Sequence, residues 1–178
     1  AMLDYVDAAS LLYRLKLDGT CVDDKWAKVY DVAKPHLNDH ILAFNDAHFL
    51  MACMGTKKKS AAKDLLESAT KFVESPSRAI GDTAMVIKEV GLSLMEAMMK
   101  HDEEDYSAAV EDLLRIRYGI VKIGGSNAQR DVFELLLLDS AIRSGKERHR
   151  KVAEALLTER GLLRPNSPML KRLCARLR

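Results

Sequence analysis

Two stretches of the chain repeat one pattern, AMMKHDEEDYSAA at residues 97–109 and AIRSGKERHRKVA at residues 141–153. In each, an alanine lies twelve positions before a second alanine, and a short polar turn separates two apolar runs with helical spacing. Pro165 lies twelve positions beyond the last alanine, where a proline can end the unit. Small residues on two consecutive helices let those helices meet closely. The pattern therefore predicts stacked helical hairpins, each of which buries a face that it could not bury alone.

This spacing is typical of the tetratricopeptide hairpin, and the rest of the chain favours an all-α fold. Apolar residues recur at helical spacing, no segment has the pattern of a convincing strand, and nearly all prolines and glycines lie at expected boundaries. We predict about nine helices that pair into four hairpins and a terminal cap, stacked in a right-handed superhelix. The periods are irregular, so residues 1–178 form one degenerate repeat domain.

Capping and breaking residues place the expected helix ends. Asn38 or Asp39 is expected to cap a third helix that ends at Met54, and Gly161 is expected to end the helix that begins at Glu147. Residues 77–82 are expected to form a loop. Ser126 and Gln129 match a capping box, in which each side chain satisfies a free backbone donor of the helix that follows.

Composition excludes several classes of protein. The net charge is +2, from 28 basic and 26 acidic side chains, and gives no bulk reason to expect nucleic acid or an anionic membrane as a partner. No apolar run approaches the roughly 20 residues that cross a bilayer, and we expect no signal peptide. Cys21, Cys53 and Cys174 are far apart and odd in number, which favours reduced thiols and a cytoplasmic location. We expect no cofactor and no metal site.

Four runs of residues resemble the tetratricopeptide repeat protein 38 family. These are HILAFNDAHFLMA at 40–52, IRYGIVKIGGSNAQRDVF at 116–133, RPNSPMLKR at 164–172, and MLDYVD at 2–7 followed by LYRL at 12–15. The resemblance covers essentially the whole chain and is loosest over residues 56–86. Members of that family are considerably longer, so it implies that this chain is their C-terminal part. It also implies an α-helical repeat protein without an assigned activity. The opening of the chain directly in helical sequence at Leu3 agrees with a piece of a longer protein.

One polar cluster interrupts an otherwise apolar helix. Residues 41–54 are apolar on almost every side, which predicts a helix buried against several neighbours. Asn45, Asp46 and His48 lie within it. They are candidates for a ligand or partner-terminus site, with His48 as donor or base and Asp46 as a cation ligand. The alternative is that they are buried hydrogen-bonding groups that fix the packing between repeats.

A second candidate site lies near the capping box. Arg130 opens the helix that begins after Ser126, where the helix dipole disfavours a cation, and a carboxylate partner, either internal or on a bound peptide, is one reason for its position. Asn127 beside it is explained by the cap but belongs to the same candidate surface. Arg115 and Arg117 of the preceding helix can join Arg130 in a carboxylate or phosphate clamp, or they form ordinary surface ion pairs.

These patterns favour a protein–protein interaction module that binds a partner peptide or helix on a concave face. Two alternatives stay open. The first is a small-molecule-binding or hydrolytic protein with a pocket near Asp46 and His48, although the sequence shows no nucleophile–base–orienter set. The second is a purely structural segment that completes an upstream repeat array. His36 and His40 are four apart, but the break at Pro35 and the expected cap argue against a zinc pair.

Overall fold

The computed structural model describes residues 2–75 and 81–177, and the regular elements within them are all helical. The all-α class is therefore confirmed for this part of the chain, whereas most of the loop expected at residues 77–82 lies outside it. The elements are α1 (Met2–Leu17), η1 (Asp23–Lys25), α2 (Trp26–Ala33), η2 (Lys34–His36), α3 (Ala43–Gly55), α4 (Lys59–Glu74), α5 (Asp82–Val86), η3 (Ile87–Gly91), α6 (Leu92–Asp102), α7 (Tyr106–Ile116), η4 (Ile120–Ile123), α8 (Asn127–Arg143), α9 (Glu147–Leu163) and α10 (Pro168–Arg176).

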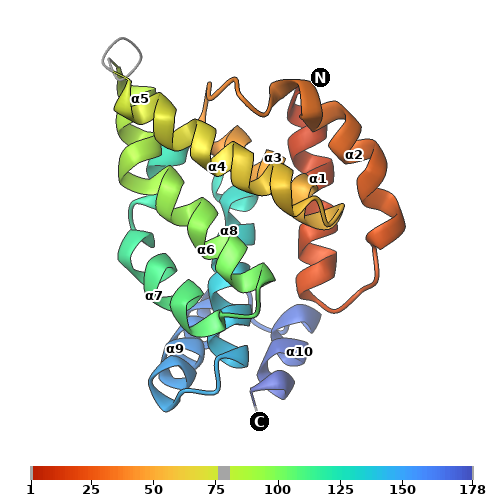
Figure 1. Cartoon of the computed structure of the whole chain (residues 1–178). Coiled ribbons are helices and arrows are strands. Elements are labelled where there is room, and N and C mark those ends of the chain that lie inside the picture. Colours follow the sequence, from red (N-terminus) through yellow and green to blue (C-terminus); the bar gives the residue numbers. More distant parts are fainter. Residues whose placement is uncertain (1, 76–80, 178) are drawn as a thin grey trace.

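The two alanine-bounded stretches form helical hairpins, as predicted. α6 packs on α7, α7 on α8, and α8 on α9 (Figure 1). Ala97 and Ala109 are fully buried, as is Ala153, and Ala141 is nearly so. Asp105 caps α7 by accepting a hydrogen bond from the backbone of Ala108, at 3.1 Å. Small buried residues therefore lie on both helices of each hairpin, where they allow close packing.

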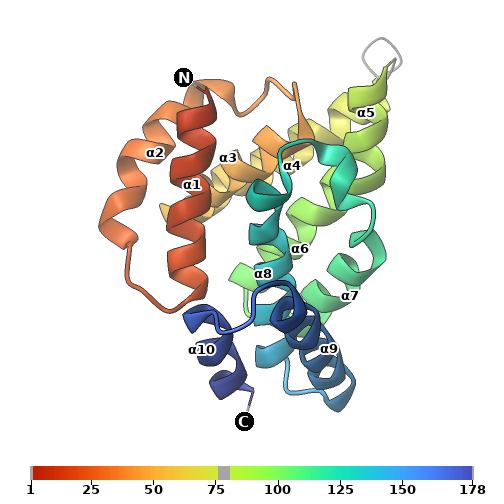
Figure 2. The ribbon, with the colours of Figure 1, turned by 180° about the vertical axis from the view of Figure 1, so that it is seen from behind.

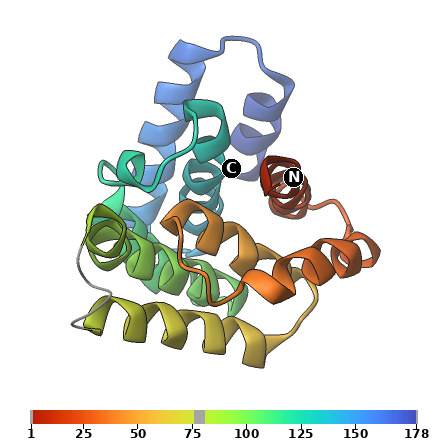
Figure 3. The same cartoon turned by 90° about the horizontal axis from the view of Figure 1, so that it is seen from above.

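Helix α3 is the most buried element, and this confirms the prediction from its all-round apolar sequence. It is surrounded by α1, α2, α4 and α6 (Figure 3). Two glycines allow this crowding. A Cβ on Gly55 would lie 2.1 Å from the Trp26 ring, and one on Gly91 of the π-helical η3 would lie 3.1 Å from Ala43. The core is thus built around α3, with backbone and side chain in direct contact at these positions.

Several predicted helix ends are wrong. Neither Asn38 nor Asp39 caps α3, because the helix begins only at Ala43 and its N-cap residue is the extended Leu42. Between them the chain turns sharply at His40, which has a positive φ of 47°. Gly161 does not end α9, which continues to Leu163, since this glycine has no positive φ. The capping box of Ser126 and Gln129 is confirmed, with both hydrogen bonds formed.

The C-terminal helix α10 packs beside the end of the N-terminal helix α1. α10 lies beside the lower end of α1 and next to α9 (Figure 2). Arg172 forms a bidentate pair with Asp18, at 2.7 and 3.2 Å, and Arg176 donates to the carbonyl of Leu17 and to Asp139. These contacts give two of the terminal basic residues internal partners. Among the described residues, no helix has the length and the apolar sequence needed to cross a bilayer.

Candidate functional site

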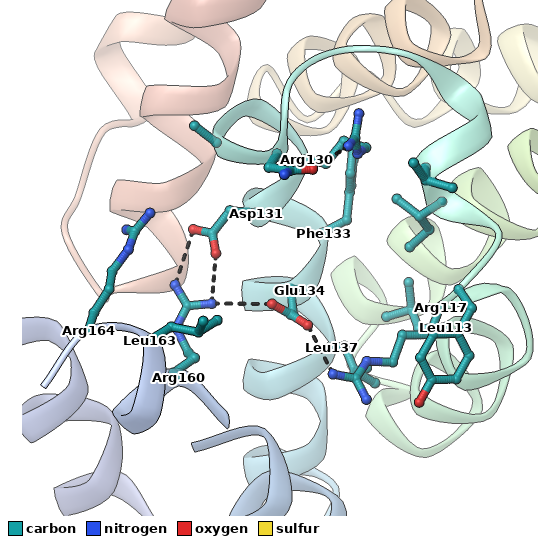
Figure 4. Close-up of a pocket in the computed structure, with 15 residues that line it drawn as sticks. Leu113, Arg117, Arg130, Asp131, Phe133, Glu134, Leu137, Arg160, Leu163 and Arg164 are labelled. Carbon is teal, nitrogen blue, oxygen red and sulfur yellow. Dashed lines mark hydrogen bonds and ion pairs between the residues drawn. The ribbon is translucent and has the colours of Figure 1, made fainter. Parts of the chain in front are cut away.

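An open hollow of about 470 Å³ lies between the end of α7, η4, α8 and the end of α9 (Figure 4). We call it the α7–α9 groove. It is lined by Leu113, Arg117, Tyr118, Ile120, Val121, Asn127, Ala128, Arg130, Asp131, Phe133, Glu134, Leu137, Arg160, Leu163 and Arg164. Three predicted site residues, Asn127, Arg130 and Arg117, are therefore brought to one surface. Arg115 is not among its lining residues and instead pairs with Asp112 on its own helix.

A chain of ion pairs crosses the groove. Asp131 of α8 accepts from Arg14 of α1 at 2.7 Å and from Arg160 of α9 at 2.8 and 3.1 Å. Glu134, one helical turn further along α8, lies 3.7 Å from Arg160 and 3.1 Å from Arg117 (Figure 4). Arg117 also forms an ion pair with Glu159 on α9. Residues i and i+3 of α8 thus present their carboxylates to arginines from α1, from α9 and from the C-terminal cap of α7.

The network changes the protonation equilibria of its members. Burial of Asp131 acts to raise its pKa, but the hydrogen bonds from Arg160 and Arg14 outweigh burial and bring the pKa below its usual value. Burial acts to lower the pKa of Arg117, but its hydrogen bonds to Glu159 and Glu134 outweigh this and raise the pKa. Both shifts favour the charged forms of Asp131 and Arg117, and the network joins three arginines to three carboxylates.

Arg130 does not have the carboxylate partner that its position predicted. Its guanidinium donates to the carbonyl of Gly124 at 3.0 Å, to the carbonyl of Gly125, and to Oδ1 of Asn127 at 2.6 Å. Within residues 2–75 and 81–177 no carboxylate forms an ion pair with it, so an internal salt bridge is excluded for that part of the chain. The side chain holds the Gly124–Gly125 turn, and its positive charge is not neutralised.

The groove has an apolar floor and apolar walls. The floor consists of the buried side chains of Leu113, Phe133 and Leu137. Tyr118 is 85% exposed at the rim, where its ring lies 5.4 Å from the Arg117 guanidinium, and Leu163 is 81% exposed on the opposite side. Large exposed apolar side chains around a groove are the usual mark of an interaction surface.

The other predicted cluster is placed elsewhere and is divided. Asn45 is partly exposed, whereas Asp46 and His48 are fully buried, and none of the three lines the groove. Nδ1 of His48 donates to the Phe44 carbonyl at 2.7 Å, and burial lowers its pKa to about 4. The ring packs between Phe44 and Phe133, so His48 is a neutral core residue behind the groove floor.

Asp46 contacts His40 rather than a cation. Its Oδ2 lies 3.1 Å from Nδ1 of His40, and burial raises its pKa even though the His40 contact acts in the opposite direction. Among the described residues there is no group of three His, Cys, Asp or Glu side chains that could hold a metal ion.

Sequence reasoning did not find Arg160, Arg164 or Tyr118, which contribute much of the groove. Arg160 lies thirty positions after Arg130, and no local spacing relates the two. Tyr118 follows the end of α7, where a short turn leads into η4. The signal in the sequence was the pair of acidic residues Asp131 and Glu134, three positions apart on one helix. Which arginines they face is known only from the packing of the helices. No family model and no solved structure matches this chain.

Proposed function

We propose that the α7–α9 groove binds a peptide segment of a partner protein, and that the segment presents an apolar side chain next to a free carboxylate. The observation that carries this proposal is an excess of positive charge beside an apolar floor. Four arginines and two carboxylates line the groove, and neither Arg130 nor Arg164 forms an ion pair with a carboxylate of the described residues. An anionic group with an apolar neighbour complements both features.

Arg130 is suited to orient such a carboxylate. A guanidinium has five N–H donors, and in Arg130 the three hydrogen bonds to the 124–127 turn leave donors for a ligand. Those hydrogen bonds also hold the side chain in one position, which reduces the entropy lost on binding. Arg164, exposed at the end of α9, supplies a second positive charge at the rim.

The apolar lining is suited to the neighbouring side chain. Phe133 and Leu137 form a floor that a leucine or an aromatic residue of the peptide can cover, and Tyr118 can fold over its edge. Tyrosine and arginine are the residue types that most often dominate the binding energy of an interface. We therefore expect affinity to depend on both the carboxylate and the apolar side chain of the peptide.

The test compares matched synthetic peptides that end in leucine or phenylalanine, either with a free carboxyl end or as the amide. Fluorescence polarisation of the labelled peptides is expected to show at least about ten-fold tighter binding for the free acids than for the amides. Arg164→Ala and Arg130→Ala are expected to remove that preference, whereas Arg150→Ala, on α9 but outside the groove, leaves it unchanged. Equal binding of acid and amide, or a preference that survives both arginine changes, would contradict the proposal. Circular dichroism checks that each variant is folded.

We also propose the wider setting of this groove. The alanine pairs of α6–α7 and α8–α9 support a tetratricopeptide-type array, and the resemblance of the sequence supports membership of the tetratricopeptide repeat protein 38 family. In this proposal the chain is the C-terminal part of a longer cytoplasmic repeat protein, and the groove lies on the concave side of a right-handed superhelix. Partner binding, rather than nucleic-acid or membrane binding, is then the main role of the module.

A further inference from the structure

Helix α4 crosses the start of α3 (Figure 1), and there Ser68 of α4 meets two side chains that lie more than twenty positions earlier in the sequence. Nδ1 of His40 lies 3.1 Å from Oδ2 of Asp46, and Nε2 of the same ring lies 2.8 Å from Oγ of Ser68. His40 is in the turn before α3, Asp46 is in the first turn of α3, and Ser68 is in the middle of α4. A hydroxyl, an imidazole and a carboxylate are thus aligned in one hydrogen-bonded row.

The row has the order that nucleophilic catalysis requires. A buried carboxylate accepts from Nδ1–H of the imidazole, which leaves Nε2 as the acceptor for the serine O–H. Both distances fall in the range expected for a nucleophile bonded to its base and a base bonded to its orienting group. Asp46 and His40 are buried, with side-chain exposures of 0% and 1%, so the base is shielded from competing water. Unrelated folds use this arrangement, and it is recognised by geometry rather than by position in the chain.

The serine end of the row opens to solvent. A hollow of about 460 Å³ is lined by Ser68 and His40 together with Asn38, Asp64, Glu67, Lys71, Phe72 and Ser75. Ser68 is only partly buried, and Phe72, one helical turn later, packs against the His40 ring at 5.4 Å. A small molecule in this hollow can therefore reach Oγ of Ser68, while His40 is held beneath it.

Two features of the row are costly for a purely structural hydrogen-bond network. His40 has a φ of 47°, a backbone conformation that side chains other than glycine rarely adopt. Oδ1 of Asp46 is buried without a hydrogen-bond partner among the described residues, and an unpaired buried acceptor costs on the order of 1–3 kcal/mol. Strain and unsatisfied polar groups concentrate at sites that bind or react.

We propose that Ser68, His40 and Asp46 form a second site, distinct from the α7–α9 groove, that hydrolyses small carboxylic esters. Ser68 and His40 are its catalytic residues, and Asp46 is a positioning residue that holds the imidazole. This assigns Asp46 to a hydrolytic site without His48, and it supplies the nucleophile–base–orienter set that the linear sequence does not show.

The reaction proceeds in two balanced steps. Oγ of Ser68 attacks the ester carbonyl carbon while its proton passes to Nε2 of His40. The C–O bond to the alcohol then breaks, and His40 returns the proton to the leaving oxygen, which gives an acyl-serine and a free alcohol. Water attacks the acyl-serine with His40 again taking the proton, the bond to Oγ breaks, and that proton restores the serine hydroxyl. The products are the carboxylic acid and the unchanged enzyme.

The lining of the hollow indicates the kind of ester. Asp64 and Glu67 oppose one Lys71, so the hollow favours neutral or cationic esters over anionic ones. Besides Ser68 and His40, the lining residues with side-chain donors for the negative charge that forms on the carbonyl oxygen are Asn38, Ser75 and Lys71, which also lies 3.9 Å from Glu67.

The experiment uses an uncharged alkyl fluorophosphonate, which forms a stable bond to an activated serine with loss of fluoride and a proton. Peptide mapping by mass spectrometry of the native protein is expected to show the adduct on Ser68. His40→Asn keeps a residue type that tolerates positive φ but is not a base, and we expect it to lower the labelling rate by about 100-fold or more.

Asp46→Asn is expected to have a similar effect on the labelling rate and to abolish a downfield NMR signal from the Nδ1 proton of His40. Steady hydrolysis of p-nitrophenyl acetate is expected to fall in parallel.

Matched variants separate the site from ordinary surface reactivity. Ser60→Ala removes an exposed serine on α4, and His36→Asn changes a neighbouring histidine outside the row, so neither is expected to alter labelling. Absence of a Ser68 adduct on the native wild-type protein would overturn the proposal. So would labelling of Ser68 that continues at an undiminished rate in a His40→Asn protein with wild-type circular dichroism. If that variant does not fold, Ser68→Ala decides through the p-nitrophenyl acetate rate, because an unchanged rate would refute the site.

Discussion

The α7–α9 groove and the core around α3 both contain charged or polar groups, but they treat them in opposite ways. In the groove, arginines and carboxylates from α1, α7, α8 and α9 neutralise one another near solvent, and Arg130 and Arg164 add further positive charge at its lining. Around α3, His48 and Asp46 are removed from solvent, and each keeps one polar atom without a hydrogen-bond partner in the described chain. A substitution of a buried polar residue is therefore expected to destabilise the fold much more than a substitution of an exposed one.

Lowering the pH is expected to have the largest effect on the free energy of unfolding, because it protonates His48. Burial lowers its pKa to about 4, whereas the unfolded chain binds the same proton near pH 6.5. Unfolding therefore takes up a proton between these pH values, and stability is lost as pH falls through this range, by about 3 kcal/mol. Urea unfolding measured from pH 7 to pH 4 tests this. His48→Gln is expected to flatten that part of the profile, and an equally steep profile in the variant would show that the histidine is not responsible.

Overpacking beside α3 is expected to have the next largest effect. In Gly55→Ala the new methyl would lie 2.1 Å from the Trp26 ring, so the buried indole has to move, at a cost of about 2 kcal/mol. Gly161→Ala is the matched control, because its nearest neighbour would be Leu170 at 3.5 Å and alanine favours a helix more than glycine does. Thermal unfolding should therefore show a lower melting temperature for the first variant and an equal or higher one for the second. Equal melting temperatures in both variants would mean that Trp26 is not held tightly.

Asp131→Asn removes the charge at the centre of the groove network, and it is expected to lower the free energy of unfolding by about 1 kcal/mol. The folded-state pKa of Asp131 lies below its usual value, so its stabilisation is present above about pH 4 and is lost as pH falls further. The stability difference between wild type and variant in urea is therefore expected at pH 7 and to shrink below pH 4. Asp31→Asn, an exposed carboxylate on α2, serves as the control. A difference that is the same at both pH values would argue against an ion-pair effect.

The smallest effect is expected for Arg164→Ala, which should change the free energy of unfolding by less than about 0.5 kcal/mol. Its side chain is exposed and pairs with no carboxylate in residues 2–75 and 81–177. Chemical denaturation would show this directly. A loss of several kcal/mol would mean that Arg164 has a structural partner and does not provide a free charge for a ligand in the groove.

Much of the helical architecture could be predicted from local patterns. The alanine spacing predicted the hairpins of α6–α7 and α8–α9, the all-round apolar run predicted a buried α3, and Ser126 with Gln129 predicted the start of α8. These features depend on periodicity and on hydrogen bonds between near neighbours, which the order of residues specifies directly. The errors occurred where packing overrides a local signal, as at Asn38 and Asp39, which do not cap, and at Gly161, which continues a helix.

For the candidate sites, too, the sequence indicated which residues are unusual but not which residues they contact. Residue types and local spacing selected Arg130 at a helix start and Asp46 within an apolar run, because charge in either context is visible in the linear order. Asn127 and Arg117 were added as expected neighbours of Arg130. Only the tertiary structure decided their partners. It turned Arg130 onto its own loop, joined Arg117 to Glu134 and Glu159, and brought Ser68 from a distant helix to His40 and Asp46. The reason is physical: such contacts span many residues, and the packing of one helix on another sets which side chains come within 3 Å.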